Sequence, residues 1–269
     1  MKRLRRSRQA ADGRQALGEP RAWLATSEEA ARRAGRWLRR HTRSQARIAA
    51  EPARDVKLSA DRDAEARIVD ILTAHADVEI LSEECGMVAS RGGRPSRLRW
   101  IVDPLDGSLN YLRGIPLCGV SVGLWDGNTP VLGAVYDFMR DEMFTGVAGQ
   151  GAWLNGRSIQ PSAVARRDRA VLVTGFPVRT TFSREALDAF LHQVRAYKKV
   201  RLLGSAALSL CYVAAGRADA YVERDIQLWD VAAGLAIVHG AGGRVVQRPS
   251  AKPGALTVYA GNNFLPIRP

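Results

Sequence analysis

The chain has few cysteines, few histidines and no long apolar run. Its three cysteines form no CxxC pair, so their spacing indicates neither a disulfide framework nor a zinc site and is typical of a reducing cytoplasm. No run of 18 apolar residues is present, and we expect no membrane span. No Ser-His-Asp or reactive-cysteine arrangement is apparent. The histidines are scattered and are expected to be surface or structural residues: His41, His75, His192 and His239.

Positive charge is unevenly distributed along the chain. The formal net charge is +13, but residues 1–50 hold 14 Lys or Arg against 4 Asp or Glu, whereas the remaining residues hold 26 against 23. Residues 1–8 are basic and lack the apolar segment of a secretory signal, and we predict that residues 1–20 form a disordered extension. This extension can bind RNA or anionic surfaces electrostatically. A solvated tail, or a start codon assigned upstream of the true one, is the simpler explanation and the one we prefer.

Helical and extended patterns alternate along residues 21–269. An apolar content of 46% over 269 residues is enough for one large core. Helices are predicted at 27–47, 59–76, 184–197, 206–215 and 231–239. Strands are predicted at 78–81, 98–102, 118–125, 131–138, 142–146, 172–174, 199–202, 220–223, 244–246 and 257–260. The pattern alone predicts one domain of layered α/β structure.

Residues 100–111 place two acids directly after an apolar run. Pro104 fixes its own backbone, and we expect it to end the strand so that the chain turns at Asp103. Asp103 and Asp106 then project into one small space and offer the hard oxygen ligands that Mg²⁺ prefers. The alternative is a plain Asx-type turn, because Asp, Pro and Gly also favour turns.

The neighbours of these two acids add features of a phosphate site. The carbonyl of Leu105 is a natural further metal ligand. Gly107 allows the backbone to approach a ligand closely. If a helical turn starts at Ser108, the amides of Gly107 and Ser108 point at an anion.

Two further segments place acids at the ends of predicted elements. Glu83 and Glu84 follow a short strand signal, and Asp230 opens a helix of small residues. Each acid alone has an ordinary explanation, a solvated loop for the two glutamates and an N-cap for Asp230. Together with the two acids of residues 100–111, they indicate a metal site assembled from distant segments.

Two of these acidic segments carry a family resemblance. Asp103-Pro-Leu-Asp-Gly-Ser-Leu-Asn-Tyr111 and Trp229-Asp230-Val-Ala-Ala-Gly234 resemble the two signatures of the inositol monophosphatase family of Mg²⁺-dependent, lithium-sensitive phosphomonoesterases. The similarity continues through Ser82-Glu83-Glu84, Gly133-Ala-Val-Tyr136, Gly149-Gln-Gly-Ala-Trp153 and Gly204-Ser-Ala-Ala207, and covers roughly residues 25 to 265. It implies an αβαβα five-layer sandwich of the inositol monophosphatase and fructose-1,6-bisphosphatase type. It also implies halves at about 21–158 and 159–269, and a homodimer.

The resemblance assigns roles to individual residues. The metal ligands, for two or three Mg²⁺ ions, would be Glu83, Asp103, Asp106, Asp230 and the carbonyl of Leu105. The catalytic residues that activate a water would be Asp61 and Ser108, together with Glu83. Ser108 stands where the family has a threonine, so it keeps the hydroxyl and lacks the β-branch that restricts the rotamer. Without the resemblance, Asp61 would be interpreted as a solvated helix residue.

The resemblance also assigns the substrate side of the site. The substrate-binding residues would be Leu105, Asp106, Gly107, Ser108, Arg201, Ala206, Glu223 and Asp230. Glu223 occupies the position where inositol monophosphatases place a glutamate that binds a substrate hydroxyl, and a polyol forms such hydrogen bonds readily. The alternative for Glu223 is an exposed acid at a strand end, paired with Arg224 or Arg217.

These features favour Mg²⁺-dependent hydrolysis of myo-inositol monophosphate or a related polyol or sugar phosphate. Fructose-1,6-bisphosphatase activity and broad sugar phosphatase activity stay open. The branch of 3'(2'),5'-bisphosphate nucleotidases usually carries Lys-Glu-Phe where this chain has Leu109-Asn110-Tyr111, which favours the inositol-type interpretation. A hypothesis from another class is an RNA- or protein-binding regulator that uses the basic N-terminus.

Overall fold

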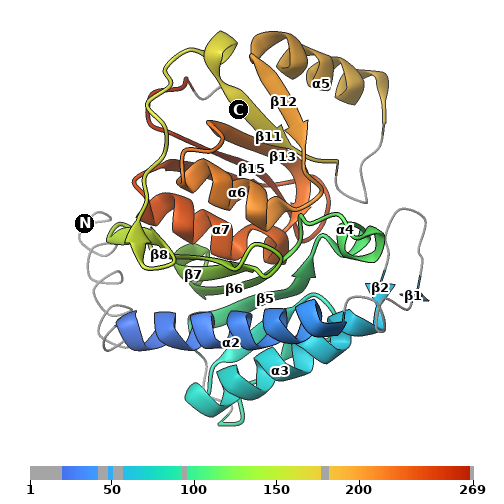
Figure 1. Ribbon diagram of the computed structural model, residues 1–269, viewed down its shortest axis with the longest axis vertical. Coiled ribbons are helices and arrows are strands. Elements are labelled where there is room, and N and C mark those ends of the chain that lie inside the picture. Colours follow the sequence, from blue (N-terminus) through green and yellow to red (C-terminus); the bar gives the residue numbers. More distant parts are fainter. Residues whose placement is uncertain (1–19, 42–47, 51–56, 93–95, 177–181, 267–269) are drawn as a thin grey trace.

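The computed structural model describes residues 20–41, 48–50, 57–92, 96–176 and 182–266 (Figure 1). The extension predicted at 1–20 lies outside these residues except for Pro20, which already belongs to a helix. None of the described helices is long and apolar enough to cross a bilayer.

The described residues form six α-helices and three sheets. The helices are α2 (Pro20–His41), α3 (Ser59–His75), α4 (Ser108–Arg113), α5 (Arg184–Ala196), α6 (Ala206–Ala214) and α7 (Leu228–Gly240), with a 3-10 turn η1 (Arg167–Arg169). A sheet of order β10-β9-β8-β7-β6-β5-β3-β4 contains β3 (Glu79–Ser82), β4 (Gly86–Val88), β5 (Leu98–Asp106), β6 (Gly119–Asp126), β7 (Thr129–Asp137), β8 (Glu142–Val147), β9 (Gly151–Leu154) and β10 (Arg157–Ser158). A sheet of order β12-β11-β13-β15-β14 contains β11 (Val171–Thr174), β12 (Lys199–Leu202), β13 (Ala220–Gln227), β14 (Arg244–Pro249) and β15 (Ala255–Gly261). A small third sheet pairs β1 (Ile48–Ala50) with β2 (Lys57–Leu58).

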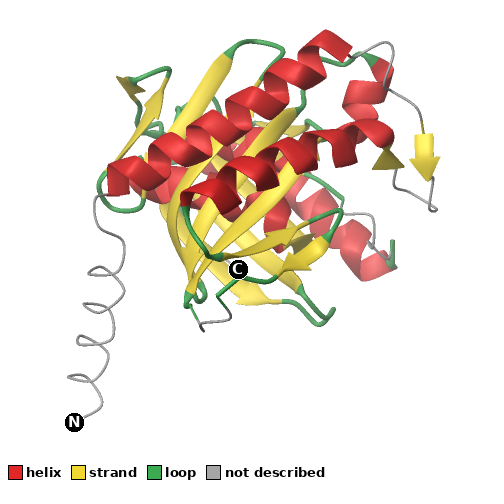
Figure 2. Cartoon of the chain, turned by 90° about the horizontal axis from the view of Figure 1, so that it is seen from below, coloured by secondary structure: helices red, strands yellow, loops and turns green. Residues whose placement is uncertain are grey.

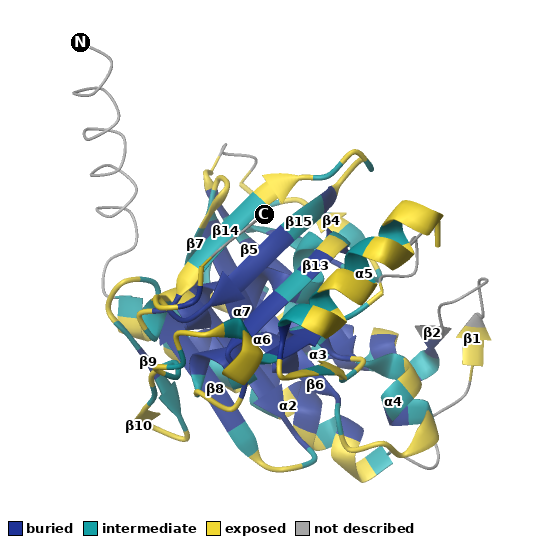
Figure 3. Ribbon diagram, turned by 90° about the horizontal axis from the view of Figure 1, so that it is seen from above, coloured by how far each residue is buried: buried dark blue, intermediate teal, exposed yellow. Residues whose placement is uncertain are grey.

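The helices and the two large sheets stack in five layers. Helices α2 and α3 cover one face of the eight-stranded sheet (Figure 2), α6 and α7 lie between the two sheets, and α5 lies on the outer face of the five-stranded sheet (Figure 1). Helix α7 is buried over the whole of 231–238, as expected for a helix that contacts a sheet on both sides. Figure 3 shows the same contrast between the buried α7 and the largely exposed α5. The predicted αβαβα sandwich is confirmed.

Glycine in the eight-stranded sheet allows α7 to pack very closely. A Cβ added at Gly133 of β7 would lie 2.5 Å from the carbonyl oxygen of Ala233, and one at Gly123 of β6 would lie 3.0 Å from the amide nitrogen of Ala233. Such distances leave no space for a side chain at either position. The first turn of α7, which carries Asp230, is therefore held at a fixed height over the sheet.

Several boundaries differ from the sequence predictions. Strand β5 continues past Pro104 to Asp106, so the expectation that Pro104 ends the strand is wrong. Its parallel pairing with β3 stops at Val102, and its pairing with β6 shifts register between Asp103 and Asp106. Proline is tolerated at such a bulge because no ladder hydrogen bond is required of it.

Other differences concern the ends of elements and short strands. Helix α7 begins at Leu228 rather than at residue 231, which places Asp230 inside its first turn. Helix α2 begins at Pro20 rather than at residue 27, and residues 42–47 lie outside the described part. The short strands β4, β9 and β10 carry too few residues for a period-2 pattern to stand out. The halves 21–158 and 159–269 stay a proposal; the eight-stranded sheet ends at Ser158.

Candidate active site

Three acids from separate segments come together at one edge of the eight-stranded sheet. One carboxylate oxygen from each of Glu83, Asp103 and Asp230 lies within 4.8 Å of the other two. Strands β3 and β5 are parallel neighbours that pair Ser82 with Val102, so Glu83 and Asp103 are the next residues of both strands and meet at the same edge. Asp230 arrives from the helical layer above, in the first turn of α7. We call these three residues the acid cluster.

Burial and mutual repulsion raise the pKa values of the two aspartates in the acid cluster. Burial is the largest cause that raises the pKa of Asp103 and of Asp230 well above the usual value, and the charge of Glu83 is the next. A cation between the carboxylates would offset this repulsion and favour their charged forms. All the donors are carboxylate oxygens, which are the ligands that hard divalent ions prefer. The residues present therefore fit a Mg²⁺ ion.

Asp106 joins two elements and is not part of the acid cluster. Its carboxylate accepts hydrogen bonds from Ser205 Oγ and from the amides of Ala206 (3.3 Å) and Ala207 (2.8 Å) at the start of α6. Burial raises the pKa of Asp106 to about 6, against the opposing effect of these hydrogen bonds. Its charge nevertheless reaches the cluster, because it contributes to the raised pKa of both buried aspartates there. The metal-binding role of Asp106 stays a prediction.

The turn between β5 and α4 is held by hydrogen bonds among its own residues. The amide of Leu105 donates to Asp103 Oδ1 (3.0 Å), and Ser108 Oγ donates to the carbonyl of Leu105 (2.9 Å). Gly107 has a φ of 88°, and a Cβ there would lie 2.8 Å from the carbonyl oxygen of Leu117. Glycine is thus required both by conformation and by space. Helix α4 begins at Ser108, so the first amides have no partner within the helix and are suited to an anion.

Asp61 is buried near the start of α3. Its Oδ2 accepts a hydrogen bond from the amide of Leu58 (2.7 Å), and the residue is 3% exposed. The interpretation of Asp61 as a solvated helix residue is therefore wrong. Burial, the charge of Cys118 and then the charge of Asp61 raise the pKa of Tyr111 in α4, which places Asp61 close to the helix that begins at Ser108. The joint action of Asp61 and Ser108 on a water stays a prediction.

Glu223 is buried on β13. The alternative of an exposed strand-end acid is wrong, because the residue is 6% exposed and Arg217 pairs with Glu142 instead. Its Oε2 accepts a hydrogen bond from Tyr221 Oη (2.7 Å). Burial raises the pKa of Glu223 to about 7, and the charge of Asp106 adds to the effect. Glu223 also lines a cavity of about 220 Å³ below α5.

The other two predicted substrate residues lie in different environments. Ala206 is in the first turn of α6, where its amide contacts Asp106. Arg201 is exposed on the edge strand β12, and its guanidinium donates to the carbonyl of Val200 (3.1 Å). Among the described contacts, none joins Arg201 to the acid cluster.

Two residues that support the site were missed in the sequence. Glu65 Oε1 accepts hydrogen bonds from Ser82 Oγ and from the amide of Cys85 (3.1 Å), which are the positions on either side of the Glu83–Glu84 pair. Ser205 Oγ donates to Asp106. The only signal for Glu65 is its spacing of four from Asp61, which puts both residues on one face of α3. Ser205 lies in the Gly204-Ser-Ala-Ala207 segment of the resemblance, but its own residue type signals only an N-cap.

The five-layer αβαβα sandwich, with an acid cluster where β3, β5 and α7 meet, is consistent with a phosphatase whose site can hold a metal ion. The chain belongs to the inositol monophosphatase family, whose sequence profile matches residues 19–262.

The proteins that are similar to this chain carry names that indicate different functions. The chain is 40% identical to the Nus factor SuhB of Xylella fastidiosa over 224 residues, which cover 81% of this chain and 78% of the relative. It is 41% identical to the inositol-1-monophosphatase of Synechocystis over 195 residues, which cover 72% and 67%. Its fold is similar to the crystal structure of the extragenic suppressor protein suhB from Bartonella henselae, with a TM-score of 0.80, 34% identity, and coverage of 90% of this chain and 95% of that one.

Proposed function

We propose that this protein is a Mg²⁺-dependent phosphomonoesterase that hydrolyses myo-inositol monophosphate, or a related polyol or sugar phosphate, to the free alcohol and phosphate. The observation that carries the proposal is the acid cluster, whose three carboxylates come from three separate elements and face one small space. Three carboxylates brought together are unfavourable without a cation, because like charges repel and burial of Asp103 and Asp230 adds to the cost. The family membership and a relative named inositol-1-monophosphatase support the same reaction.

The residues of the chain have distinct parts in this proposal. Glu83, Asp103 and Asp230 would hold the metal, and the carbonyl of Leu105 and the carboxylate of Asp106 would extend the ligand set to a second ion. Bound Mg²⁺ supplies charge neutralisation of the phosphate and lowers the pKa of a coordinated water. Asp61 and Ser108 orient that water for in-line attack. The amides of Gly107 and Ser108 bind the phosphate oxygens.

The proposed alcohol-binding residues come from β12, β13 and the first turn of α6. We propose that Glu223 accepts a hydrogen bond from a substrate hydroxyl, and that Ala206 and Arg201 are further substrate contacts. A buried acid that hydrogen-bonds a hydroxyl discriminates strongly against substrates that lack it. We also propose that the protein forms a homodimer in the cytoplasm.

Asp103→Asn tests the metal site. The variant keeps the size of the side chain and removes one charged ligand, and we expect phosphate release from inositol 1-phosphate to fall by about 100-fold or more. Wild-type turnover should require Mg²⁺ and fall with lithium. The matched control is Asp70→Asn, an exposed acid of α3, which should keep full activity. Full activity in Asp103→Asn would refute the site.

A substrate panel identifies the alcohol. Phosphate release from inositol 1-phosphate, fructose 1,6-bisphosphate and 3'-phosphoadenosine 5'-phosphate is compared at saturating Mg²⁺. We expect the highest kcat/KM for the inositol ester. A preference for fructose 1,6-bisphosphate or for the nucleotide would keep the phosphatase and overturn its proposed substrate.

A second candidate function comes from the relative named Nus factor SuhB. In this alternative, the chain is a regulator that binds RNA or protein through the basic residues at its N-terminus. We expect deletion of residues 1–20 to weaken RNA binding at low salt and to leave phosphatase activity unchanged. RNA affinity that is the same with and without these residues would exclude the N-terminus as the binding element.

A further inference from the structure

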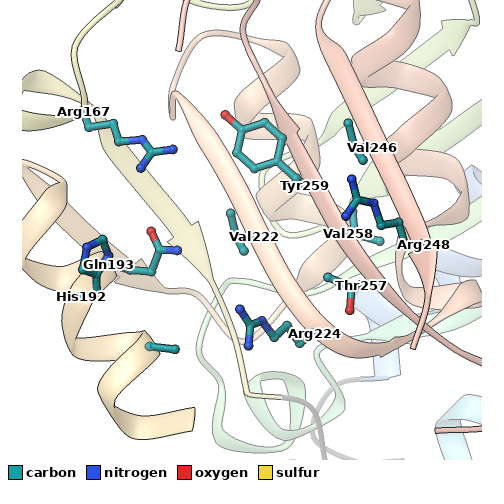
Figure 4. A pocket seen from close by; sticks show the side chains of 11 residues that line it. Arg167, His192, Gln193, Val222, Arg224, Val246, Arg248, Thr257, Val258 and Tyr259 are labelled. Carbon is teal, nitrogen blue, oxygen red and sulfur yellow. The ribbon is translucent and has the colours of Figure 1, made fainter. Parts of the chain in front are cut away.

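A second cavity lies on the outer side of the five-stranded sheet, between that sheet and α5 (Figure 4). It has a volume of about 290 Å³ and is lined by residues of η1, α5, β13, β14 and β15. Along β13 the side chains alternate between the two faces of the sheet. Tyr221 packs in the core between the sheets and hydrogen-bonds Glu223, whereas Val222 and Arg224 line this second cavity. We call it the outer cavity.

The lining of the outer cavity is strongly cationic. Arg167, Arg224 and Arg248 come from three different elements and line the same cavity (Figure 4). His192 of α5 lies beside them, and no aspartate or glutamate lines the cavity. Within the described part of the chain, the side chains of Arg224 and Arg248 make neither an ion pair nor a hydrogen bond. Arg224 and Arg248 are exposed, and the charge of Arg224 also reaches the neighbouring Asp225. An anion in the cavity would gain from the remaining positive charge around it.

Two buried polar atoms in the same cavity point to the same conclusion. Tyr259 is 5% exposed, and its hydroxyl has no hydrogen-bond partner among the described residues. The Nε of Arg167 is likewise buried without a partner, while Nη2 of the same group donates to the carbonyl of Pro266 (2.5 Å). Leaving a buried donor unsatisfied is unfavourable, because the group has given up its hydrogen bonds to water without replacing them. Burial also raises the pKa of Tyr259 to about 12, so its hydroxyl keeps the proton that it can donate.

We propose that the outer cavity binds a small molecule that carries a phosphate group. A phosphate offers three terminal oxygens and nearly two negative charges, which match several guanidinium groups and one hydroxyl donor better than a single carboxylate does. Val222 of β13 and Val246 of β14 give the rest of the ligand an apolar wall. The volume is at the lower limit of ligand pockets, about 300 Å³, so the ligand is small.

The outer cavity is not a second catalytic site. None of its lining residues is a carboxylate that could hold a metal, and none belongs to the acid cluster. The inference therefore goes beyond the proposed phosphatase activity and does not depend on it. Because Glu223 and Arg224 are neighbours on β13, a ligand bound in the outer cavity acts on the strand that also carries the proposed substrate residue.

Titration calorimetry with inorganic phosphate and inorganic pyrophosphate tests the proposal. The full-length protein is used in EDTA and low salt, so that binding through a metal at the acid cluster is removed. We expect saturable binding of pyrophosphate that Arg224→Ala and Arg248→Ala each weaken by about tenfold, the loss of one charge-assisted hydrogen bond. Tyr259→Phe keeps the ring and should weaken binding by roughly fivefold. Arg157→Ala, an exposed arginine of β10 in the other large sheet, is the matched control and should change binding less than about twofold.

The outcomes separate a specific site from the general attraction of a basic protein for anions. Equal weakening by Arg157→Ala would show general attraction, and binding that survives both cavity arginine variants would place the anion elsewhere. Either result, or the lack of saturable binding, overturns the proposal. Thermal melting of each variant verifies that it is folded. Pyrophosphate binding that persists in Asp103→Asn would support a site independent of the acid cluster, whatever that variant shows about catalysis.

Discussion

At the scale of the residue, Glu223 combines burial, a hydrogen bond from Tyr221 and a pKa of about 7. A carboxyl group with this pKa changes charge near neutral pH. A charged carboxylate accepts a stronger hydrogen bond from a substrate hydroxyl than a neutral carboxyl does. Protonation of Glu223 therefore has a direct effect on how tightly the alcohol is held.

Glu223→Gln tests this link between charge and substrate affinity. For the wild type, we expect the KM for inositol 1-phosphate to fall as the pH rises from 6 to 8, because the pKa of about 7 is passed and the carboxylate becomes charged. The glutamine variant cannot titrate, so its KM should be about tenfold higher at pH 8, with a smaller pH dependence and little change in kcat. The measurement is a set of kcat and KM values across this range. An identical pH profile of KM in the variant would contradict the role of Glu223.

Single residues also show what local sequence can and cannot reveal. Glu83 and Asp103 were predicted to contribute to one metal site because each follows an apolar strand signal. The structure adds that β3 and β5 are parallel neighbours, which brings the two acids to a common edge. Glu65 and Ser205 were not found, because their hydrogen bonds join positions 17 and 99 residues apart. A periodic pattern reports which face of a helix is buried, and it carries no information about partners at such separations.

At the scale of the element, α3 supports the loop that carries Glu83. The carboxylate of Glu65 accepts hydrogen bonds from Ser82 and Cys85, so it fixes the backbone on both sides of the metal ligand. Groups that orient a ligand in this way commonly affect metal affinity more than the chemical step.

Glu65→Ala should weaken the binding of Mg²⁺ by about 10- to 100-fold without abolishing catalysis. We expect activity to require more Mg²⁺ and kcat at saturating Mg²⁺ to return to near the wild-type value. Glu65→Gln keeps one oxygen acceptor, so its Mg²⁺ requirement should lie between those of the wild type and Glu65→Ala. Activity is measured across a Mg²⁺ titration for all three proteins, with far-UV circular dichroism as a control for folding. A loss of kcat that excess Mg²⁺ cannot restore would show that Glu65 does more than position the loop.

Elements also show why one sequence rule failed here. Proline ends strands because it cannot donate a ladder hydrogen bond, and this argued for a turn at Asp103. In the structure, the partner β3 has already ended at Ser82, and a bulge with β6 absorbs Pro104, so β5 reaches Asp106. The pairing partners of a strand decide whether proline is tolerated, and these are a property of the sheet rather than of the local sequence.

At the scale of the whole molecule, the two large sheets and α7 converge on buried carboxylates whose charge opposes folding. The pKa values of Asp103 and Asp230 are well above the usual value, that of Asp106 is about 6 and that of Glu223 is about 7. A raised folded-state pKa means that the native protein binds protons more tightly than the unfolded chain does. The contribution of these groups to stability is therefore present at low pH and is lost as the pH rises through the folded-state values.

This linkage predicts opposite effects of pH and of metal on melting. In EDTA, the contribution of these acids should lower the melting temperature between about pH 5 and pH 8. Mg²⁺ competes with protons for the same oxygens, so the rise in melting temperature on adding Mg²⁺ should be larger at pH 8 than at pH 6. At about 100 times its Kd the ion adds about 2.7 kcal/mol. Calorimetric melts with and without Mg²⁺ give the change in melting temperature caused by the ion at each pH. Titratable groups that do not interact with the metal affect both melts equally and do not contribute to this change. In Asp103→Asn this difference should shrink at every pH. A Mg²⁺ effect that is independent of pH, or that survives unchanged in Asp103→Asn, would place the ion outside the acid cluster.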